Sequence, residues 1–269
     1  MTERTSHTQV AERAELAAVA ADSRLEPFFR ETAKQVLVAL ARNPNLKEHD
    51  LLRLLERKDL SKEALRELSQ HAEAAHSYRV KLALARHPRT PRLVSLPLIK
   101  FLYPFDLVRV SQTPAVPTDV KMVAEETILT KVEALPRGEK ITLARRSSGR
   151  VAAALLVTQD SEVVRAALCN PYLSEGHLLQ VLALDKLPAV AVELVSQHER
   201  WSRAYHLRLA LIRNPLTPFA RVLAFLPEVA VNDLRDICLD HRMPEQVRKY
   251  ILAYCAQRLK RSARGNQLA

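Results

Sequence analysis

The strongest constraint on this 269-residue chain is a short pattern that occurs twice with little change. LALARHPRTPRLVSLPLI runs from Leu82 to Ile99, and LALIRNPLTPFARVLAFL runs from Leu209 to Leu226. In both stretches an apolar run is followed by Arg, then His or Asn, then Pro, and after one more residue by Thr-Pro and further apolar residues. Proline disfavours the helical conformation of the residue before it, so the first helix should end at the His or Asn. Thr followed by Pro is a start signal for the next helix. The pattern therefore predicts two helices joined by a tight corner.

Further copies of this corner are spread along the chain. When the copies are aligned on the position before the proline, the aligned residues are Asn43, His87, Arg146, Asn170 and Asn214. Two weaker copies begin at Arg109 and Cys238. A unit of about 22–27 residues describes most of the chain, and periods in this range are typical of stacked repeats. Such a unit cannot bury its apolar face alone, so we expect an all-α chain, an α-solenoid whose neighbouring units share one core.

Local features support these corners. Asn before the proline tolerates the left-handed backbone conformation that often ends a helix. Ser61 and Ser174 are expected to start helices in the same way as the Thr-Pro pairs.

The copies from Ala83 to Leu98 and from Ala210 to Leu226 resemble the leucine-rich-variant repeat and are similar more broadly to HEAT-type helical repeats. The resemblance implies a right-handed superhelix of stacked helices over residues 35–255, and we expect about five to seven helical pairs in it. Residues 1–34 would form an N-terminal helical cap, and residues 256–269 a basic, partly disordered tail. The third copy has Ser147 where proline is expected, and residues 101–140 match poorly, so we expect a longer or distorted unit there.

Several kinds of site are excluded by composition. The four glycines stand apart, so no glycine-rich phosphate loop is expected. The three cysteines show no C-x-x-C spacing, and the nine histidines show no metal-ligand spacing, so we expect neither a disulfide framework nor a metal site. Proteins of the leucine-rich-variant family carry an N-terminal cysteine cluster that ligates iron and sulfur, but no cysteine precedes Cys169 here, so we expect no cofactor. No apolar run reaches the ~18 residues of a membrane span, and no signal peptide is evident, so a cytoplasmic location is expected.

Charge suggests one candidate surface. The net charge is +11, with 13 basic and 7 acidic residues over 35–100 and four basic residues over 256–269. Arginines immediately precede the aligned position in four copies, and one occupies it in the third; they are Arg42, Arg86, Arg145, Arg213 and Arg146. In a stack these could form a basic ladder that follows phosphates. The alternative is that each arginine only interacts with the carbonyls at its own helix end.

Trp201 is the single tryptophan, and Arg200, Arg203 and Tyr205 lie beside it. Aromatic rings among cations can stack on bases, and HEAT-like DNA glycosylases use such a face. No matching W-x-x-x-D pattern follows here, and the alternative is that Trp201 anchors the start of a helix. Cys169 is expected to be a small packed residue rather than a nucleophile.

We therefore expect a non-enzymatic scaffold that binds a protein or peptide on the concave face of a helical solenoid. Sequence-independent nucleic-acid binding through the basic ladder is the alternative, and a HEAT-like glycosylase is the least favoured function. The candidate partner-binding residues are Arg42, Arg86, Arg145, Arg146, Arg213 and Trp201. The identity of the partner and the oligomeric state are left open by the sequence.

Overall fold

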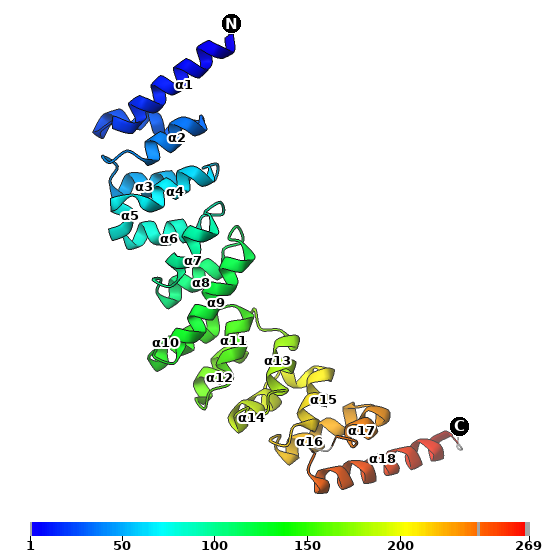
Figure 1. Cartoon of the computed structure of the whole chain (residues 1–269). Helices are drawn as coiled ribbons and strands as arrows, with labels where there is room; N and C mark the ends of the chain where they lie inside the picture. Colours follow the sequence, from blue (N-terminus) through cyan, green and yellow to red (C-terminus); the bar gives the residue numbers. More distant parts are fainter. Residues whose placement is uncertain (1, 241–242, 267–269) are drawn as a thin grey trace. The chain divides into compact units, whose positions relative to one another are not determined.

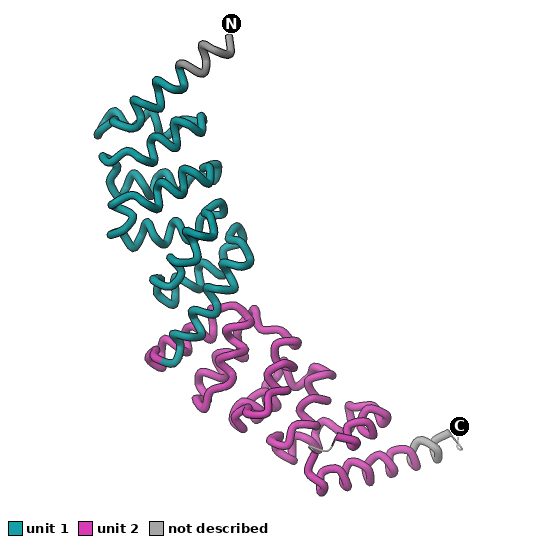
Figure 2. Tube along the Cα trace, in the orientation of Figure 1, with its two compact units in different colours: residues 1–133 teal, residues 134–269 magenta. Residues whose placement is uncertain are grey.

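The computed structural model describes residues 2–240 and 243–266, and this part of the chain is helical without any β-strand (Figure 1). The predicted all-α class is confirmed. The chain forms two compact units, residues 1–133 and residues 134–269 (Figure 2). Within the described ranges, no helix is both long and apolar enough to cross a bilayer.

Unit 1 consists of short helices joined by tight connections. In chain order these are α1 (Thr2–Val19), the 3₁₀ helix η1 (Asp22–Arg30), α2 (Lys34–Ala41), α3 (Glu48–Leu55), α4 (Lys62–Gln70), α5 (Ala72–His76), α6 (Tyr78–Arg86), α7 (Arg92–Ile99), α8 (Pro104–Gln112) and α9 (Thr118–Val132). The predicted distorted region around residues 101–140 contains α9, which at 15 residues is longer than the helices before it except α1, and it also contains the boundary between the units.

Unit 2 follows the same plan. Its elements are α10 (Arg137–Arg146), α11 (Gly149–Leu155), α12 (Ser161–Leu168), α13 (Glu175–Leu182), α14 (Ala189–Gln197), the 3₁₀ helix η2 (Trp201–Arg203), α15 (Tyr205–Arg213), α16 (Phe219–Phe225), the 3₁₀ helix η3 (Leu226–Glu228), α17 (Val231–Ile237) and α18 (Glu245–Asn266). The predicted C-terminal tail is largely part of α18, and its last residues, 267–269, lie outside the described residues.

The sequence pattern of unit 1 recurs in unit 2 at a constant offset. This offset equals the number of residues from Asn43 to Asn170. Helices α2, α3, α4 and α6 match α12, α13, α14 and α15 at this offset, both where they begin and where they end. Identical residues at the same offset include Tyr78 and Tyr205, Thr90 and Thr217, and Asp106 and Asp233. The chain therefore carries a duplicated module, within which the shorter corners recur.

Helices within each unit pack in two series. In unit 1, α1 packs on α2 and α2 on α4, while α3 packs on α6 and α6 on α8. In unit 2, α10, α12 and α14 form one series, and α11, α13, α15 and α17 form the other. Leucines from both series are fully buried, as Leu40, Leu51 and Leu84 show in unit 1. Because the helices are short, most of their backbone groups lie near an end, and those ends need partners.

Asn43 and Asn170 supply partners at equivalent corners. Each side chain has no exposed surface. The Asn43 amide donates from Nδ2 to the carbonyls of Ala17 and Ala20 at 2.8 and 2.7 Å, and its Oδ1 accepts from the Asn45 backbone N–H at 2.9 Å. Asn170 does the same with Ala144 and Ser147 at 2.8 and 3.0 Å, and with the Tyr172 N–H at 2.7 Å. A single amide side chain thus hydrogen-bonds both to its own turn and to the end of the helix in the preceding layer. We call this arrangement a bracket.

His87 and Asn214 make the same type of bracket at the second pair of corners. His87 Nδ1 accepts from the Arg89 N–H at 3.2 Å, and Nε2 donates to the Arg57 carbonyl at 2.8 Å. Both residues have extended backbones, with φ of −74° and −79°. The helix therefore ends before proline as predicted, but the expected left-handed conformation is not used. With this extended backbone, the His87 and Asn214 side chains bond both to their own turn and to the end of the helix in the preceding layer.

The threonines of these corners act differently from the prediction. The N-caps of α7 and α16 are Pro91 and Pro218, not the threonines. Thr90 instead donates its hydroxyl to the Leu84 carbonyl at 2.7 Å, and Thr217 donates to Leu211 at 2.5 Å. Each threonine therefore satisfies the end of the preceding helix. The serine prediction is confirmed, because the Ser61 and Ser174 side chains accept from the N-terminal turns of α4 and α13.

At the third corner the sequence alignment is one residue out. Ser147, not Arg146, is the fully buried residue that follows α10, and its backbone is extended. Ser148 then caps α11 by accepting from the Val151 N–H. Gly149 follows because a Cβ there would collide with the Tyr172 carbonyl oxygen and the His177 ring. The missing proline is thus replaced by a serine cap and a close helix approach.

Two tyrosines link successive layers. The Tyr78 hydroxyl donates to Asp106 Oδ2 at 2.6 Å and accepts from the Tyr103 N–H at 3.0 Å, at the start of α8. Tyr205 repeats this with Asp233 and with the Ala230 N–H, at the start of α17. Burial and the bond to Asp106 raise the pKa of Tyr78 to about 12, so it remains a donor at neutral pH.

We predict that Asn170→Ala lowers the free energy of unfolding of unit 2 by about 2–4 kcal/mol, because three buried backbone groups lose their partner. The measurement is urea unfolding followed by fluorescence of Trp201, the single tryptophan, which is buried in this unit. Gln180→Ala is the matched control, since Gln180 is an exposed amide on α13, and it should cost less than about 0.5 kcal/mol. Equal losses for the two variants would contradict the bracket.

Candidate functional site

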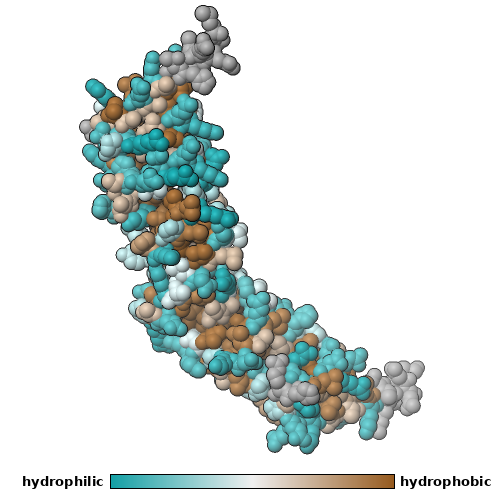
Figure 3. Space-filling view, in the orientation of Figure 1, coloured by the Kyte–Doolittle hydropathy of each residue, from teal (hydrophilic) through white to brown (hydrophobic). Residues whose placement is uncertain are grey.

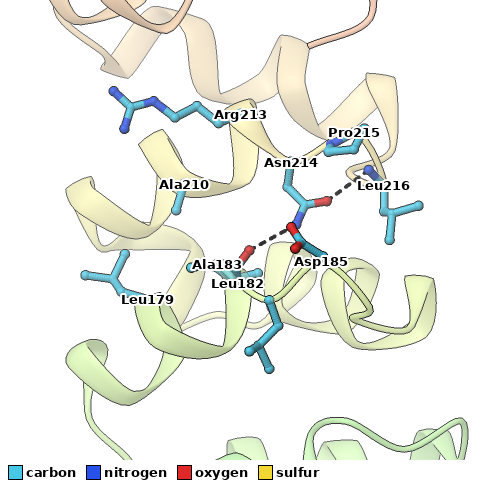
Figure 4. Close-up of a pocket in the computed structure, with 10 residues that line it drawn as sticks. Leu179, Leu182, Ala183, Asp185, Ala210, Arg213, Asn214, Pro215 and Leu216 are labelled. Carbon is cyan, nitrogen blue, oxygen red and sulfur yellow. Dashed lines mark hydrogen bonds between the residues drawn. The ribbon is translucent and has the colours of Figure 1, made fainter. Parts of the chain in front are cut away.

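The described residues of unit 2 contain a groove between the ends of two neighbouring helices of one series. Its volume is about 510 Å³. One wall is the end of α13 and the turn after it, and the other is the end of α15 and its corner (Figure 4). The lining residues are Leu179, Leu182, Ala183, Leu184, Asp185, Ala210, Arg213, Asn214, Pro215 and Leu216.

Asn214 holds the two walls together. Its Nδ2 donates to the Leu182 carbonyl at 3.4 Å, and its Oδ1 accepts from the Leu216 N–H at 3.0 Å (Figure 4). Ala210 lies one turn earlier on α15, and its small side chain leaves room in the groove. The corner that ends α15 therefore also forms the wall of the groove.

The groove combines apolar walls with separated charges. Leu184 and Leu216 are 49% and 43% exposed. Arg213 is exposed and extends away from Asn214 and Asp185 (Figure 4). Arg213 makes no hydrogen bond or ion pair with any other described side chain. An exposed arginine without a side-chain partner can form charge-assisted hydrogen bonds with the carboxylate of a ligand.

Unit 1 fills the equivalent space with polar groups. The residues that correspond to Leu184 and Leu216 are Arg57 and Arg89. The Arg57 guanidinium donates to Asp59 and to the Phe29 carbonyl, and Arg89 donates to the Asp59 carbonyl at 3.0 Å. Helices α3 and α6 have the same lengths as α13 and α15. The module therefore folds without the exposed leucines, and their presence in unit 2 is specific to that surface.

Within each unit, the predicted arginines lie on different series of helices. Arg42 lies at the end of α2 and donates to Glu67 on α4 at 2.8 Å. Arg86 ends α6, which belongs to the other series of unit 1. Arg145 and Arg146 end α10, whereas Arg213 ends α15 in the other series of unit 2. Consecutive arginines of the expected ladder therefore alternate between the helix series within each unit. Only Arg213 lines the groove.

Trp201 is 3% exposed, so its ring offers no stacking surface. Its Nε1 donates to the Leu168 carbonyl at the end of α12 at 3.0 Å, and the Arg200 guanidinium lies 4.1 Å from the ring centre. Trp201 begins η2, directly before α15. Trp201 therefore anchors the start of a helix, which was the alternative to the predicted binding role, and its ring is not available to a partner.

The prediction that Cys169 is a small packed residue is wrong, because Cys169 is exposed. It lies at a shallow depression lined by Arg165, Leu168, Leu194, Gln197 and His198. Burial lowers the pKa of His198. Burial raises the pKa of the other two thiols, those of Cys238 and Cys255. Among the described residues there is no cluster of His, Cys, Asp and Glu that could hold a metal ion.

Sequence reasoning missed Leu184, Asp185 and Leu216. They lie in turns, where periodicity carries little information. The signal that could have found them is the constant offset between the two copies of the module, which shows leucine where the first copy has arginine. In comparisons with known proteins, no family model, curated protein or solved structure matches the chain.

We predict that His87, the counterpart of Asn214, makes the stability of unit 1 sensitive to acid. Burial lowers the pKa of His87, so the unfolded chain binds the proton more readily than the folded unit does. Stability should therefore fall as pH drops through the ordinary histidine range, from about 7.5 to 5.5.

His87→Asn should flatten this dependence, because the amide found at Asn214 can occupy the position without titrating. The measurement is urea unfolding followed by circular dichroism across this pH range. His76→Asn, at an exposed histidine, is the control and should leave the profile unchanged. A profile that is identical in the wild type and His87→Asn would refute the prediction.

Proposed function

We propose that this chain is a non-enzymatic binding protein, an α-solenoid of the leucine-rich-variant or HEAT-like kind that holds a protein or peptide partner on its concave face. The groove between α13 and α15 carries the proposal. It exposes leucines at positions where the duplicate module has hydrogen-bonded arginines. Burial of apolar area contributes about 25 cal/mol per Å², so a partner that covers these leucines would gain binding free energy from them.

The chemistry of the groove favours a peptide. A volume of about 510 Å³ accommodates one or two large side chains. Leu184, Leu216 and Leu179 would contact an aliphatic or aromatic side chain of the partner. Arg213 lies at the rim and would pair with a carboxylate beside that side chain. We therefore propose that the ligand segment contains an apolar residue next to an acidic one.

A cytoplasmic location is part of the proposal. All three cysteines are free thiols, which is the usual state in a reducing compartment.

The alternative function is sequence-independent binding of nucleic acid. It is supported by one observation: Arg86 and Arg213 are equivalent, identical and exposed, and neither pairs with a described side chain. Such arginines can contact phosphates. Under this alternative, a labelled single-stranded oligonucleotide would bind with an affinity that falls steeply with salt, and Arg86→Glu with Arg213→Glu would abolish binding.

We predict that peptides selected from a random library against the full chain will include a class that binds the groove. For this class, Leu184→Arg with Leu216→Arg should raise Kd at least about tenfold, because the substitutions install the residues of unit 1 and fill the groove. The measurement is fluorescence anisotropy of a labelled selected peptide.

Leu239→Gln is the matched control for this experiment. Leu239 is also an exposed leucine of unit 2, it lies outside the groove lining, and Gln112 is its counterpart in unit 1. It should leave Kd unchanged. If no selected peptide responds to the groove variant, the proposed function is wrong.

A further inference from the structure

Helix α7 in unit 1 presents an apolar stripe to solvent. Leu93 is 85% exposed and Phe101, in the turn after the helix, is 67% exposed. Pro97 lies between them, one turn after Leu93 on α7, and is also exposed. Tyr103, at the N-cap of α8, extends the stripe and is 66% exposed. Figure 3 shows apolar atoms gathered over α7 and α8 on this face.

The duplicate module shows that the fold does not require this stripe. The residues of unit 2 that correspond to Leu93, Pro97, Phe101 and Tyr103 are Ala220, Ala224, Glu228 and Ala230. Helices α16 and α17 nevertheless begin at the positions that correspond to the first residues of α7 and α8. The larger apolar side chains of unit 1 therefore add surface chemistry to a fold that forms without them.

One pair of positions shows the difference directly. In unit 2, Arg208, whose side chain is only 11% exposed, forms an ion pair with Glu228 at 2.5 Å. In unit 1 the equivalent residues are Lys81 and Phe101, and the Lys81 ammonium lies 5.8 Å from the centre of the Phe101 ring. The acidic partner has been replaced by an exposed ring, and the cation remains. This leaves a positive charge beside an apolar surface.

The whole segment around the stripe is free of acidic residues. Between Glu73 and Asp106 there is no Asp or Glu, whereas this stretch contains Arg79, Lys81, Arg86, Arg89, Arg92 and Lys100. Asp119 on α9 pairs with Arg92, and Glu48 on α3 lies 3.7 Å from Arg79. The remaining cations of the segment have no carboxylate partner among the ion pairs of the described residues. The unpaired cations therefore make this surface complementary to a negatively charged partner.

The shape of the stripe favours a helical protein segment over a nucleic acid. Leu93 and Pro97 are aliphatic and cannot stack on bases, whereas single-strand binding depends on open aromatic faces. The two rings are partly occupied, since Tyr103 lies against Tyr78 with ring centres 4.8 Å apart and Lys81 lies over Phe101. An amphipathic helix, in contrast, contacts its partner through side chains spaced three and four apart.

We propose that the exposed face of α7 and the start of α8 in unit 1 form a docking surface for an acidic amphipathic helix of a partner protein. Its apolar side chains would pack on Leu93, Pro97 and Phe101, and its flanking carboxylates would face Lys81 and Lys100. This surface is separate from the groove of unit 2 and does not depend on the function proposed for that groove.

The test uses the full chain and a fluorescein-labelled helical peptide with leucines on one face and glutamates on both flanks. The wild type should bind this peptide, and a peptide with lysines in place of the glutamates should bind at least about tenfold more weakly. Leu93→Ala with Phe101→Glu should raise Kd for the acidic peptide at least about tenfold. Both substitutions install residues that the duplicate module already contains, so the helix is expected to remain folded, and circular dichroism will check this.

Leu252→Glu is the matched control. It also replaces an exposed apolar residue with glutamate, and the counterpart of Leu252 in unit 1 is Glu125. It should leave Kd unchanged, as should the groove variant Leu184→Arg with Leu216→Arg, which separates this proposal from the one for unit 2. The proposal is overturned if the wild type does not bind the acidic peptide or if the α7 variant binds it equally well. It is also overturned if oligodeoxythymidine, rather than the peptide, binds in a manner that depends on Phe101.

Discussion

The architecture of each unit depends on how the ends of short helices satisfy their backbone groups. A helix of only two turns leaves nearly all of its terminal N–H and C=O groups without partners inside the helix. In this chain, Asn43 and Asn170 each satisfy one N–H of their own turn and two carbonyls of the preceding layer. These bonds are buried, so they are costly to lose.

The duplicated module separates what the fold requires from what the surface adds. Residues that are the same in both units, such as Tyr78 and Tyr205, make the same hydrogen bonds between layers. Some residues that differ, such as Arg57 and Leu184, lie in turns between helices of equal length. Selection for packing alone does not explain an exposed leucine where arginine serves the same backbone. Differences between the copies are therefore the most informative guide to function in this chain.

Two surfaces that differ between the copies combine apolar side chains with positive charge. The groove of unit 2 has lost polar groups and gained leucines, whereas α7 of unit 1 has apolar side chains beside cations. Both suit the side chains of another polypeptide, because each combines apolar area with a charge that can orient a ligand. The arginines predicted as a ladder contribute less. Arg42 pairs with Glu67, and the others lie on different series of helices within their units.

The sequence alone determined the helical class and the positions of the proline-containing corners, because proline, serine caps and apolar periodicity act over a few residues. It did not determine the role of Thr90, which bonds backward to Leu84, or the burial of Trp201, because both depend on the neighbouring helix ends. The sequence alignment placed Arg146 rather than Ser147 at the third corner. No proline marks this corner, because a serine cap begins the next helix there. The groove was beyond local patterns, because its walls come from two helices that meet only when the module has folded.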